Sequence, residues 1–369
     1  MLELLPAGST PTICGVPAAA EFFGVAKKGS SQRRVILDRR RRNVMEKSLP
    51  RVLGELLASG VLDEPTYLRL MRLTMLPHPS QLVDVVAGPS ERLFVSGEDV
   101  AEFYHSLLWP AARWHENAVG SLVRPSELKA HVVSPERAAH LCRVQAACRD
   151  AALQPCLTSP GMGDQKSSAV AQAFNQHLLV EASALSEDNW MTYGFPSPVG
   201  RVWAGSYIDD IMVLLISEAD AQGKPVSDDD LALVHRLRQA HAAAGTMLHT
   251  SKRQERVTQA VIWGAQTDGD CARVRGEASV AHQLIRVTMA ALIHGEISAH
   301  MATCLTSSWT HHMMFARQSL CLFQEVYAFG GQRPRHRLRG ITALVADELL
   351  GASILSPLFE CDCRAPLHH

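Results

Sequence analysis

The chain has 369 residues and a formal net charge of -1 at neutral pH, with 47% hydrophobic and 20% charged residues. This composition excludes a disordered, collagen-like or fibrous chain. The length allows a large core divided into about two or three subdomains. Nine cysteines without a C-x-x-C pair fit a reducing compartment better than a secreted disulfide scaffold.

The N-terminal stretch has no basic leader before an apolar run, so it does not resemble a signal peptide. The most apolar helical stretch, residues 278–305, is interrupted by Arg286, His294, Glu296 and His300. A membrane-spanning helix would not carry these residues. We therefore expect no membrane partner and a cytoplasmic or nuclear location.

The predicted elements begin with a β-branched run at 34–38, which favours a strand. Residues 49–75 predict helices, interrupted at Gly60 and at Asp63-Glu64-Pro65. A second short strand is expected at 92–95, leading into Asp99, and a helix at 100–108. Around the first of these strands, eight of the sixteen residues from 27 to 42 are Lys or Arg. Such a strip can contact phosphates, although a solvated basic loop is the alternative.

One or two helices are expected within 109–152, followed by a tight loop at 161–164 and a helix at 167–184. Two strands within 206–217 are expected to be joined by a turn at the aspartates, and a helix at 227–244 to stop at Gly245. A strand at 257–267 and helices from 277 to about 355 complete the prediction. Strands and helices are mixed without regular βαβ alternation. The expected fold class is α+β.

The tetrapeptide Tyr207-Ile208-Asp209-Asp210 places two adjacent acids between apolar strand residues. Two carboxylates about 4 Å apart repel by roughly 4 kcal/mol at an effective dielectric constant of 20. A strand hairpin is expected to keep such a pair only where a cation binds. Paired carboxylates on a tight turn suit Mg²⁺, which prefers oxygen ligands. The tetrapeptide alone is a weak signal, because it also occurs by chance.

Tyr-x-Asp-Asp on a hairpin resembles the palm motif of reverse transcriptases, and other motifs of that family follow in the same order. The segment RRVILDRRRRN resembles the family's fingers strand, with Arg34, Asp38 and Asn43 at matching positions. Lys27 falls where the family places a second triphosphate-binding cation. Asp99-Val100-Ala101-Glu102-Phe103-Tyr104 is similar to the first palm motif, in which an aromatic residue stands five positions after the metal-binding Asp.

The resemblance continues through Gly161-Met162-Gly163-Asp164 with Gln172, similar to the loop and helix that support the template and the incoming base. Residues 248–252 look like the lysine motif. Residues 262–266 look like the primer-grip hairpin. In all, the resemblance covers residues 25 to 350, nearly the whole chain.

The resemblance implies a right-hand polymerase with fingers, a ferredoxin-like palm and a helical thumb. The implied boundaries are fingers at 1–90, palm at 91–108 and 153–270, a fingers insertion at 109–152, thumb or connection at 271–355, and a tail at 356–369. This tail is too short for a ribonuclease H-like domain with its own core, so we expect none in this chain.

The implied function is RNA-directed DNA polymerase activity, which adds deoxynucleotides to a primer 3′ end. The implied partners are an RNA or DNA template with its primer and deoxynucleoside triphosphates, and no oligomeric state is predicted. Two Mg²⁺ ions, or Mn²⁺ in their place, would be held by Asp99, Asp209 and Asp210, and Lys252 would protonate the leaving pyrophosphate. The other implied site residues are Lys27, Arg34, Tyr104, Gly163 and Gln172 for the nucleotide, and Tyr207, Trp263, Gly264, Arg40 and Asn43 for nucleic acid.

Each assignment has a structural alternative. Asp99 could be a helix N-cap, and Tyr104 a half-buried core aromatic. Arg34 could be a surface ion-pair partner of Asp38, and Lys252 a solvated lysine. For the whole chain, the alternatives are a catalytically decayed or domesticated retroelement fragment that only binds nucleic acid, and an RNA-copying polymerase with the same palm.

Overall fold

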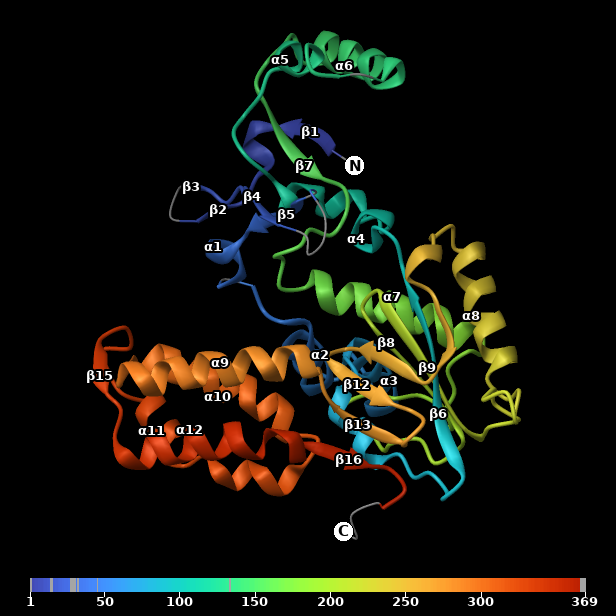
Figure 1. The fold of residues 1–369 in the computed structure, drawn as a ribbon. Helices are drawn as coiled ribbons and strands as arrows, with labels where there is room; N and C mark the ends of the chain where they lie inside the picture. Colours follow the sequence, from blue (N-terminus) through green and yellow to red (C-terminus); the bar gives the residue numbers. More distant parts are fainter. Residues whose placement is uncertain are drawn as a thin grey trace. The chain divides into compact units, whose positions relative to one another are not determined.

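A computed structural model of the chain describes residues 2–13, 16–26, 31, 33–44, 46–132 and 134–365, and for residues 16, 17, 34 and 41 it describes the backbone alone. Helices and strands are mixed along the chain (Figure 1), as the α+β prediction requires. The chain divides into two compact units. The first comprises residues 1–75, 100–178 and 242–247, and the second comprises residues 76–99, 179–241 and 248–369.

The second unit contains a four-stranded antiparallel sheet in the order β10-β6-β9-β8. Its strands are β6 (Glu91–Asp99), β8 (Val202–Tyr207), β9 (Asp210–Glu218) and β10 (Gln254–Val257). The central strand β9 is buried from residue 211 to residue 217, on both of its faces. Helix α8 (Leu231–Ala243) lies alongside this sheet (Figure 1). The two strands expected within 206–217 and the helix that stops at Gly245 are confirmed, and Gly245 has a positive φ of 71°.

A second antiparallel sheet of the same unit has the order β11-β12-β13-β16. Its strands are β11 (Gln259–Ile262), β12 (Ala265–Asp268), β13 (Arg273–Gly276) and β16 (Glu360–Asp362). Leu93, Met212 and Leu214 of the first sheet share one buried core with Ala265 and Val274 of the second. The single strand expected at 257–267 is therefore wrong in detail, because a turn at residues 263–264 folds it into a hairpin.

Four helices of this unit form a bundle, α9 (Ala278–His294), α10 (Ala299–Met313), α11 (Glu325–Gly330) and α12 (Ala343–Leu355), together with the short strands β14 (Glu296–Ser298) and β15 (Leu338–Gly340). Trp309 is fully buried at the centre of the bundle, and its Nε1 donates to Thr288 Oγ1 at 3.0 Å. The helical prediction for residues 277–355 is confirmed for α9 to α12, but two short strands, a 3₁₀ helix at Arg317–Leu322 and the segment 331–337 separate these helices. Within the described residues, none of the helices combines the length and the apolar character that crossing a membrane requires.

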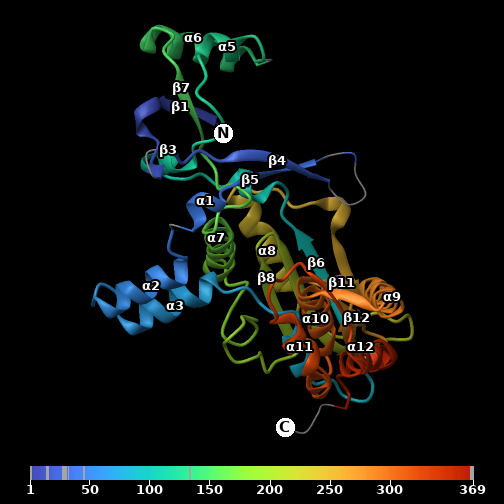
Figure 2. The same ribbon diagram turned by 90° about the vertical axis from the view of Figure 1, so that its left-hand side faces the viewer.

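The first unit is built from three two-stranded antiparallel sheets and several helices. Its strands are β1 (Leu2–Pro6), β2 (Thr12–Ile13), β3 (Val16–Pro17), β4 (Glu21–Ala26), β5 (Arg33–Asp38) and β7 (Leu153–Leu157). Its helices are α1 (Arg40–Asn43), α2 (Leu49–Ala58), α3 (Glu64–Thr74), α4 (Phe103–Ser106), α5 (Pro125–Lys129), α6 (Pro135–Cys148) and most of α7 (Ser167–Glu181). Figure 2 shows β4 and β5 as a hairpin and α2 beside α3.

Several predictions for this unit are confirmed. The strand at 34–38 is β5, and the helical region at 49–75 forms α2 and α3. Asp63 caps α3 by accepting a hydrogen bond from the backbone N of Thr66 at 2.8 Å, with Pro65 in the first turn. The break between the two helices therefore falls where the sequence places its capping residue.

The helix expected at 100–108 is wrong in length, because α4 has a single turn. The backbone N of Ala101 donates to the carbonyl of Met247 at 2.7 Å, which attaches the start of this segment to a distant part of the chain. Glu102, with a positive φ of 47°, precedes the helix. Asp99 ends β6 and caps no helix, which excludes the N-cap alternative.

The loop at 161–164 is held against β5. Leu37 donates its backbone N–H to the carbonyl of Met162 at 2.8 Å, and Asn43 Nδ2 donates to the carbonyl of Gly163 at 2.8 Å. Gly163 has a φ of 103°, and a Cβ added there would lie 2.1 Å from the backbone oxygen of Leu37. Glycine is therefore required both by conformation and by space.

A buried arginine completes this attachment. Arg39 is 4% exposed and donates to Asn117 Oδ1 at 2.8 Å, to the Asp164 carboxylate, and to Glu46 Oε1 at 3.2 Å. Burial lowers the pKa of this guanidinium, and the neighbouring carboxylates of Asp164 and Glu46 oppose that shift. Because a buried charge is costly without partners, Arg39 fixes the loop to β5.

Replacing Gly163 by alanine tests this attachment. The new methyl group would overlap the Leu37 carbonyl, so we expect the free energy of unfolding in urea to fall by about 1–3 kcal/mol. Gly120→Ala is the matched control, because Gly120 also has a positive φ, of 60°, but has nothing within 4 Å of an added Cβ. Equal losses in the two variants would contradict the close approach.

Candidate active site

The hairpin between β8 and β9 presents the paired acids. Tyr207 is paired in register with Asp210, so Ile208 and Asp209 form a two-residue turn. Ile208 has a positive φ of 59°, a conformation that a β-branched residue rarely adopts. Such a residue costs about 1–3 kcal/mol and is typical of functional sites.

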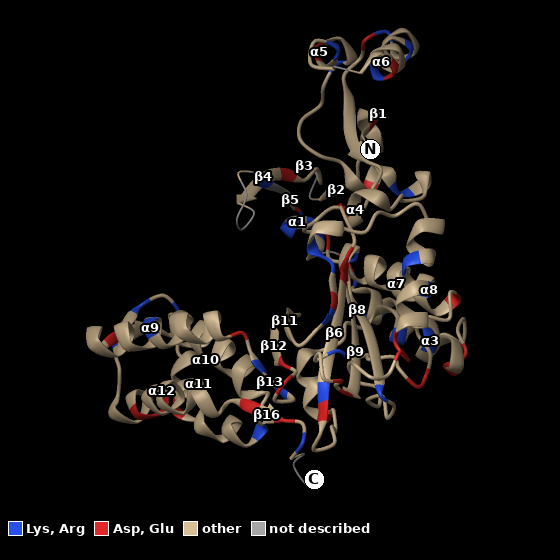
Figure 3. Ribbon diagram, turned by 45° about the vertical axis from the view of Figure 1, so that its right-hand side comes forward, with Lys and Arg blue, Asp and Glu red and all other residues tan. Residues whose placement is uncertain are grey.

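Asp99 lies directly opposite Asp210. The two residues are Cα partners in the β6–β9 ladder, where Cβ atoms are typically about 4.5–5.5 Å apart. Acidic residues gather at this end of β6 (Figure 3). Burial of its carboxyl group, followed by the charges of Asp209 and Asp99, raises the pKa of Asp210 to about 7. The charge of Lys252 opposes this shift but does not outweigh it.

A lysine reaches Asp99 from the next segment. Lys252 ends the short 3₁₀ turn at Thr250–Lys252, and its Nζ lies 2.7 Å from Asp99 Oδ2. His249 Nε2 lies 3.6 Å from Asp99 Oδ1, and the backbone N of His249 donates to the carbonyl of Asp99 at 2.8 Å. The alternative of a purely solvated lysine is therefore wrong, although Lys252 remains 47% exposed.

An aromatic residue borders the same carboxylates. The turn between β11 and β12 consists of Trp263 and Gly264, with positive φ values of 55° and 82°. The Trp263 Nε1 donates to the backbone oxygen of Asp210 at 3.3 Å, and its ring lies 6.4 Å from that of Tyr207. A tryptophan with positive φ is uncommon, which indicates that this turn serves the position of the side chain.

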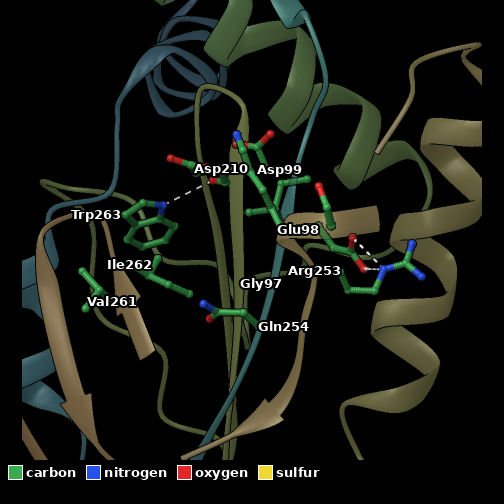
Figure 4. A pocket seen from close by; sticks show the side chains of 12 residues that line it. Gly97, Glu98, Asp99, Asp210, Arg253, Gln254, Val261, Ile262 and Trp263 are labelled. Atoms are coloured by element: carbon green, nitrogen blue, oxygen red, sulfur yellow. Dashed lines mark hydrogen bonds and ion pairs between the residues drawn. The ribbon is translucent and has the colours of Figure 1, made fainter. Parts of the chain in front are cut away.

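These residues line one cleft of about 470 Å³ (Figure 4). It is walled by the ends of β6 and β9, the segment before and into β10, and β11. The cleft thus brings together four of the predicted site residues: Asp99, Asp210, Lys252 and Trp263. Among the described residues, no group of three or more His, Cys, Asp or Glu side chains is arranged to hold a metal ion.

The remaining predicted site residues of the second unit lie in the two turns. Asp209 and Tyr207 belong to the β8–β9 hairpin, and Gly264 to the β11–β12 turn. The Nε2 of His311 lies 3.4 Å from the carbonyl oxygen of Gly264.

The predicted nucleotide and nucleic-acid residues of the first unit have varied settings. Tyr104 is half-buried in α4, and Gln172 is fully buried in α7 with its Nε2 donating to the carbonyl of Met75 at 3.3 Å. Arg40 is exposed and forms two hydrogen bonds with Asp38, at 2.9 and 2.6 Å. Lys27 lies outside the described residues, as does the side chain of Arg34.

Three further residues at this cleft were not predicted from the sequence: Glu98 and Arg253, which line it, and His249, which contacts Asp99. Glu98 could have been noticed, because an acid that interrupts the apolar run of a central strand requires a partner. The position of His249 depends on how the chain returns to β6, and local patterns do not predict that return.

Comparison with known proteins gives a likeness of fold. No protein-family model matches the chain, and no curated protein sequence matches it. Among solved structures, the foamy viral protease-reverse transcriptase dRH in complex with double-stranded DNA matches with a TM-score of 0.53 and 10% identity, over 92% of this chain and 43% of that chain. The foamy viral protease-reverse transcriptase in complex with an RNA/DNA hybrid matches with a TM-score of 0.53 and 11% identity, over 92% and 33%. This chain spans less than half the length of either, and the fold is similar to that of a reverse transcriptase.

The opposed carboxylates predict a pH-dependent stability. The raised pKa of Asp210 means that ionising this group costs more in the folded state than in the unfolded state. The cost is absent below the unfolded pKa near 3.8, grows between there and about pH 7, and is complete above it. In EDTA, we expect Asp210→Asn to unfold at a higher temperature than the wild type at pH 8, and the difference to vanish near pH 4. If Asp210→Asn were less stable than the wild type by the same amount at pH 4 and pH 8, the repulsion among the carboxylates would be contradicted.

Proposed function

We propose that the chain is an RNA-directed DNA polymerase that extends a primer on an RNA or DNA template with deoxynucleotides. The observation that carries the proposal is the in-register pairing of Asp99 with Asp210 at the mouth of a cleft. A sheet has no structural use for two opposed carboxylates, which destabilise it. Support also comes from a fold similar to that of polymerases whose solved structures hold DNA or an RNA/DNA hybrid.

The donor set of the cleft fits a divalent cation. Carboxylate oxygens are the ligands that Mg²⁺ prefers, and a cation bound there would stabilise the ionised form of Asp210, whose pKa is raised by burial and by the charges of Asp209 and Asp99. Asp99, Asp209 and Asp210 would hold two Mg²⁺ ions, with Mn²⁺ as a substitute. When bound, such ions make the primer hydroxyl more acidic and neutralise charge on the triphosphate.

The residues of the chain have distinct roles in this proposal. Lys252 holds a proton at Nζ next to Asp99 and would give it to the leaving pyrophosphate. Trp263 and Tyr207, whose rings lie side by side at the turn, would support the primer end together with Gly264.

The roles of the first unit remain proposals from the family resemblance. Lys27 and Arg34 would bind the β- and γ-phosphates, and Tyr104 would exclude a ribose 2′-hydroxyl. Gly163, Gln172, Arg40 and Asn43 would support the template and the incoming base. In these terms, residues 1–90 and the insertion at 109–152 would form the fingers, residues 91–108 and 153–270 the palm, and residues 271–355 the thumb or connection.

A nucleic-acid-binding module without catalysis is the second candidate. The observation that favours it is the ion pair itself, because Lys252 neutralises Asp99 in the way that a bound cation would. In such a module, the cleft would bind no divalent ion and the acids would contribute only to local structure.

Primer extension separates the two candidates. With an RNA template, a DNA primer, Mg²⁺ and the four deoxynucleotides, we expect extension by the wild type and a loss of at least about a thousandfold in Asp210→Asn, in line with removal of an electrostatic element of catalysis. Asp229→Asn is the matched control, since Asp229 is an exposed acid of the same unit. Wild-type protein that binds the template but extends no primer would sink the polymerase proposal.

Cation binding can be measured without activity. Mg²⁺ should raise the melting temperature of the wild type in a concentration-dependent way, because a ligand that binds the folded state alone stabilises it. Asp210→Asn should lose most of this shift, whereas Asp229→Asn should retain it. Equal shifts in all three proteins would indicate ion binding elsewhere.

A further inference from the structure

A buried ion cluster lies beside the cleft, on residues to which the proposed chemistry gives no role. The Glu98 side chain is 3% exposed, on β6 immediately before Asp99. Arg238 of α8 donates its Nε to Glu98 Oε1 at 2.6 Å, and Arg253 donates its Nε to Glu98 Oε2 at 3.2 Å. Arg238 also binds Glu255 at 2.6 Å.

The buried cluster contains Glu98 and Arg253, and the ion pair of the cleft joins the residues next to them in the chain, Asp99 and Lys252. Glu98 and Asp99 follow each other on β6, and their respective partners, Arg253 and Lys252, follow each other in the reverse direction. Successive side chains of a strand point to opposite faces. The segment that enters β10 is therefore attached to β6 through two successive side chains. The contact between Glu98 and Arg253 can be followed in Figure 4.

The backbone alone holds this segment weakly. In the β10–β6 ladder, Gln254 pairs with Gly97 and Val257 with Val95, with a register shift between the two pairs. A bulge of this kind interrupts a ladder and loosens its pairing. One further backbone hydrogen bond, from His249 to Asp99, lies on the other side of Lys252. Side-chain attachment is thus needed to hold the lysine in place.

The charges of the cluster make it a firm attachment. Burial lowers the pKa of Arg238, but its hydrogen bonds to Glu98 and Glu255 outweigh that effect and the pKa is raised overall. Removing one partner would leave the Glu98 carboxylate buried with too little compensating charge, which is strongly unfavourable. Arg253 therefore cannot move away from β6 freely.

We propose that Glu98 and Arg253 are positioning residues that hold Lys252 against Asp99. Arg253 attaches the segment to β6 through Glu98, so the preceding residue, Lys252, is presented to Asp99. The consequence for nucleotide addition rests on the proposed function. The placement of Lys252 does not, and it can be measured in the protein alone.

The first experiment measures the reactivity of Lys252. Whole folded protein is treated briefly with acetic anhydride, and acetylation is followed by mass spectrometry, with exposed Lys224 as an internal reference. We expect Arg253→Ala to raise the relative acetylation rate of Lys252 several-fold, and Arg253→Lys to restore it in part. Glu98→Gln, which keeps hydrogen-bonding oxygen at this position, should give an intermediate rate.

Glu255→Gln is the matched control, because Glu255 is 61% exposed and contacts Arg238 without touching Arg253. It should leave the acetylation of Lys252 unchanged. An unchanged rate in Arg253→Ala, or an equal rise in Glu255→Gln, would overturn the positioning role. Both outcomes are independent of polymerase activity.

The second experiment measures single-turnover nucleotide addition. Displacing a catalytic group by about 1 Å can cost on the order of a hundredfold in rate, so Arg253→Ala should slow addition by about tenfold to a hundredfold. The apparent affinities for nucleotide and primer-template should stay unchanged, and Arg253→Lys should recover part of the rate. A fall in affinity alone would contradict positioning. A wild type that adds no nucleotide, with acetylation as expected, would refute the proposed function and leave the placement standing.

Discussion

The second unit depends on a repulsive constraint, two carboxylates fixed opposite each other on neighbouring strands. Asp99 and Asp210 cannot separate, because the nine residue pairs of the β6–β9 ladder set their register. A shift of one residue would turn Leu93 and Leu214 from the shared core to the other face. The apolar core therefore holds the charged pair in place, and the repulsion is offset by Lys252 rather than relieved by movement.

Backbone strain is concentrated around the same pair. Ile208 and Trp263 both have positive φ values, and each lies in a two-residue turn that borders Asp210. Neither turn uses the glycine or asparagine that would be relaxed at its first position. A residue keeps an unfavourable backbone conformation only when the surrounding structure enforces it. Such strained residues are typical of functional sites. Two strained turns and an opposed acid pair in one cleft are difficult to explain as packing alone.

How much the sequence predicts differs between short-range and long-range features. The β8–β9 hairpin was predictable because Asp209 and Asp210 interrupt an apolar run, and the bundle because its apolar residues follow the helical period. The cluster at Glu98 was not predictable, since its partner Arg253 is 155 residues away. The length of α4 could not be predicted either, because Glu102 adopts a left-handed conformation at its N-cap without the glycine or asparagine that usually marks one.

The basic strip shows why charge patterns alone overstate a nucleic-acid surface. Both the phosphate-contacting hypothesis and the solvated-loop alternative assume that the arginines of the strip point outward. Arg39 is instead buried against Asp164, and Arg42 binds Glu46 and the Glu116 carbonyl. These two charges join β5 and α1 to the loop that carries Gly163, so they build the first unit. In the described part of the strip, Arg33 and Arg40 are exposed, and a phosphate at Arg40 would have to compete with Asp38. Arg39 and Arg42 must then contribute less to nucleic-acid affinity than the composition of the strip suggests.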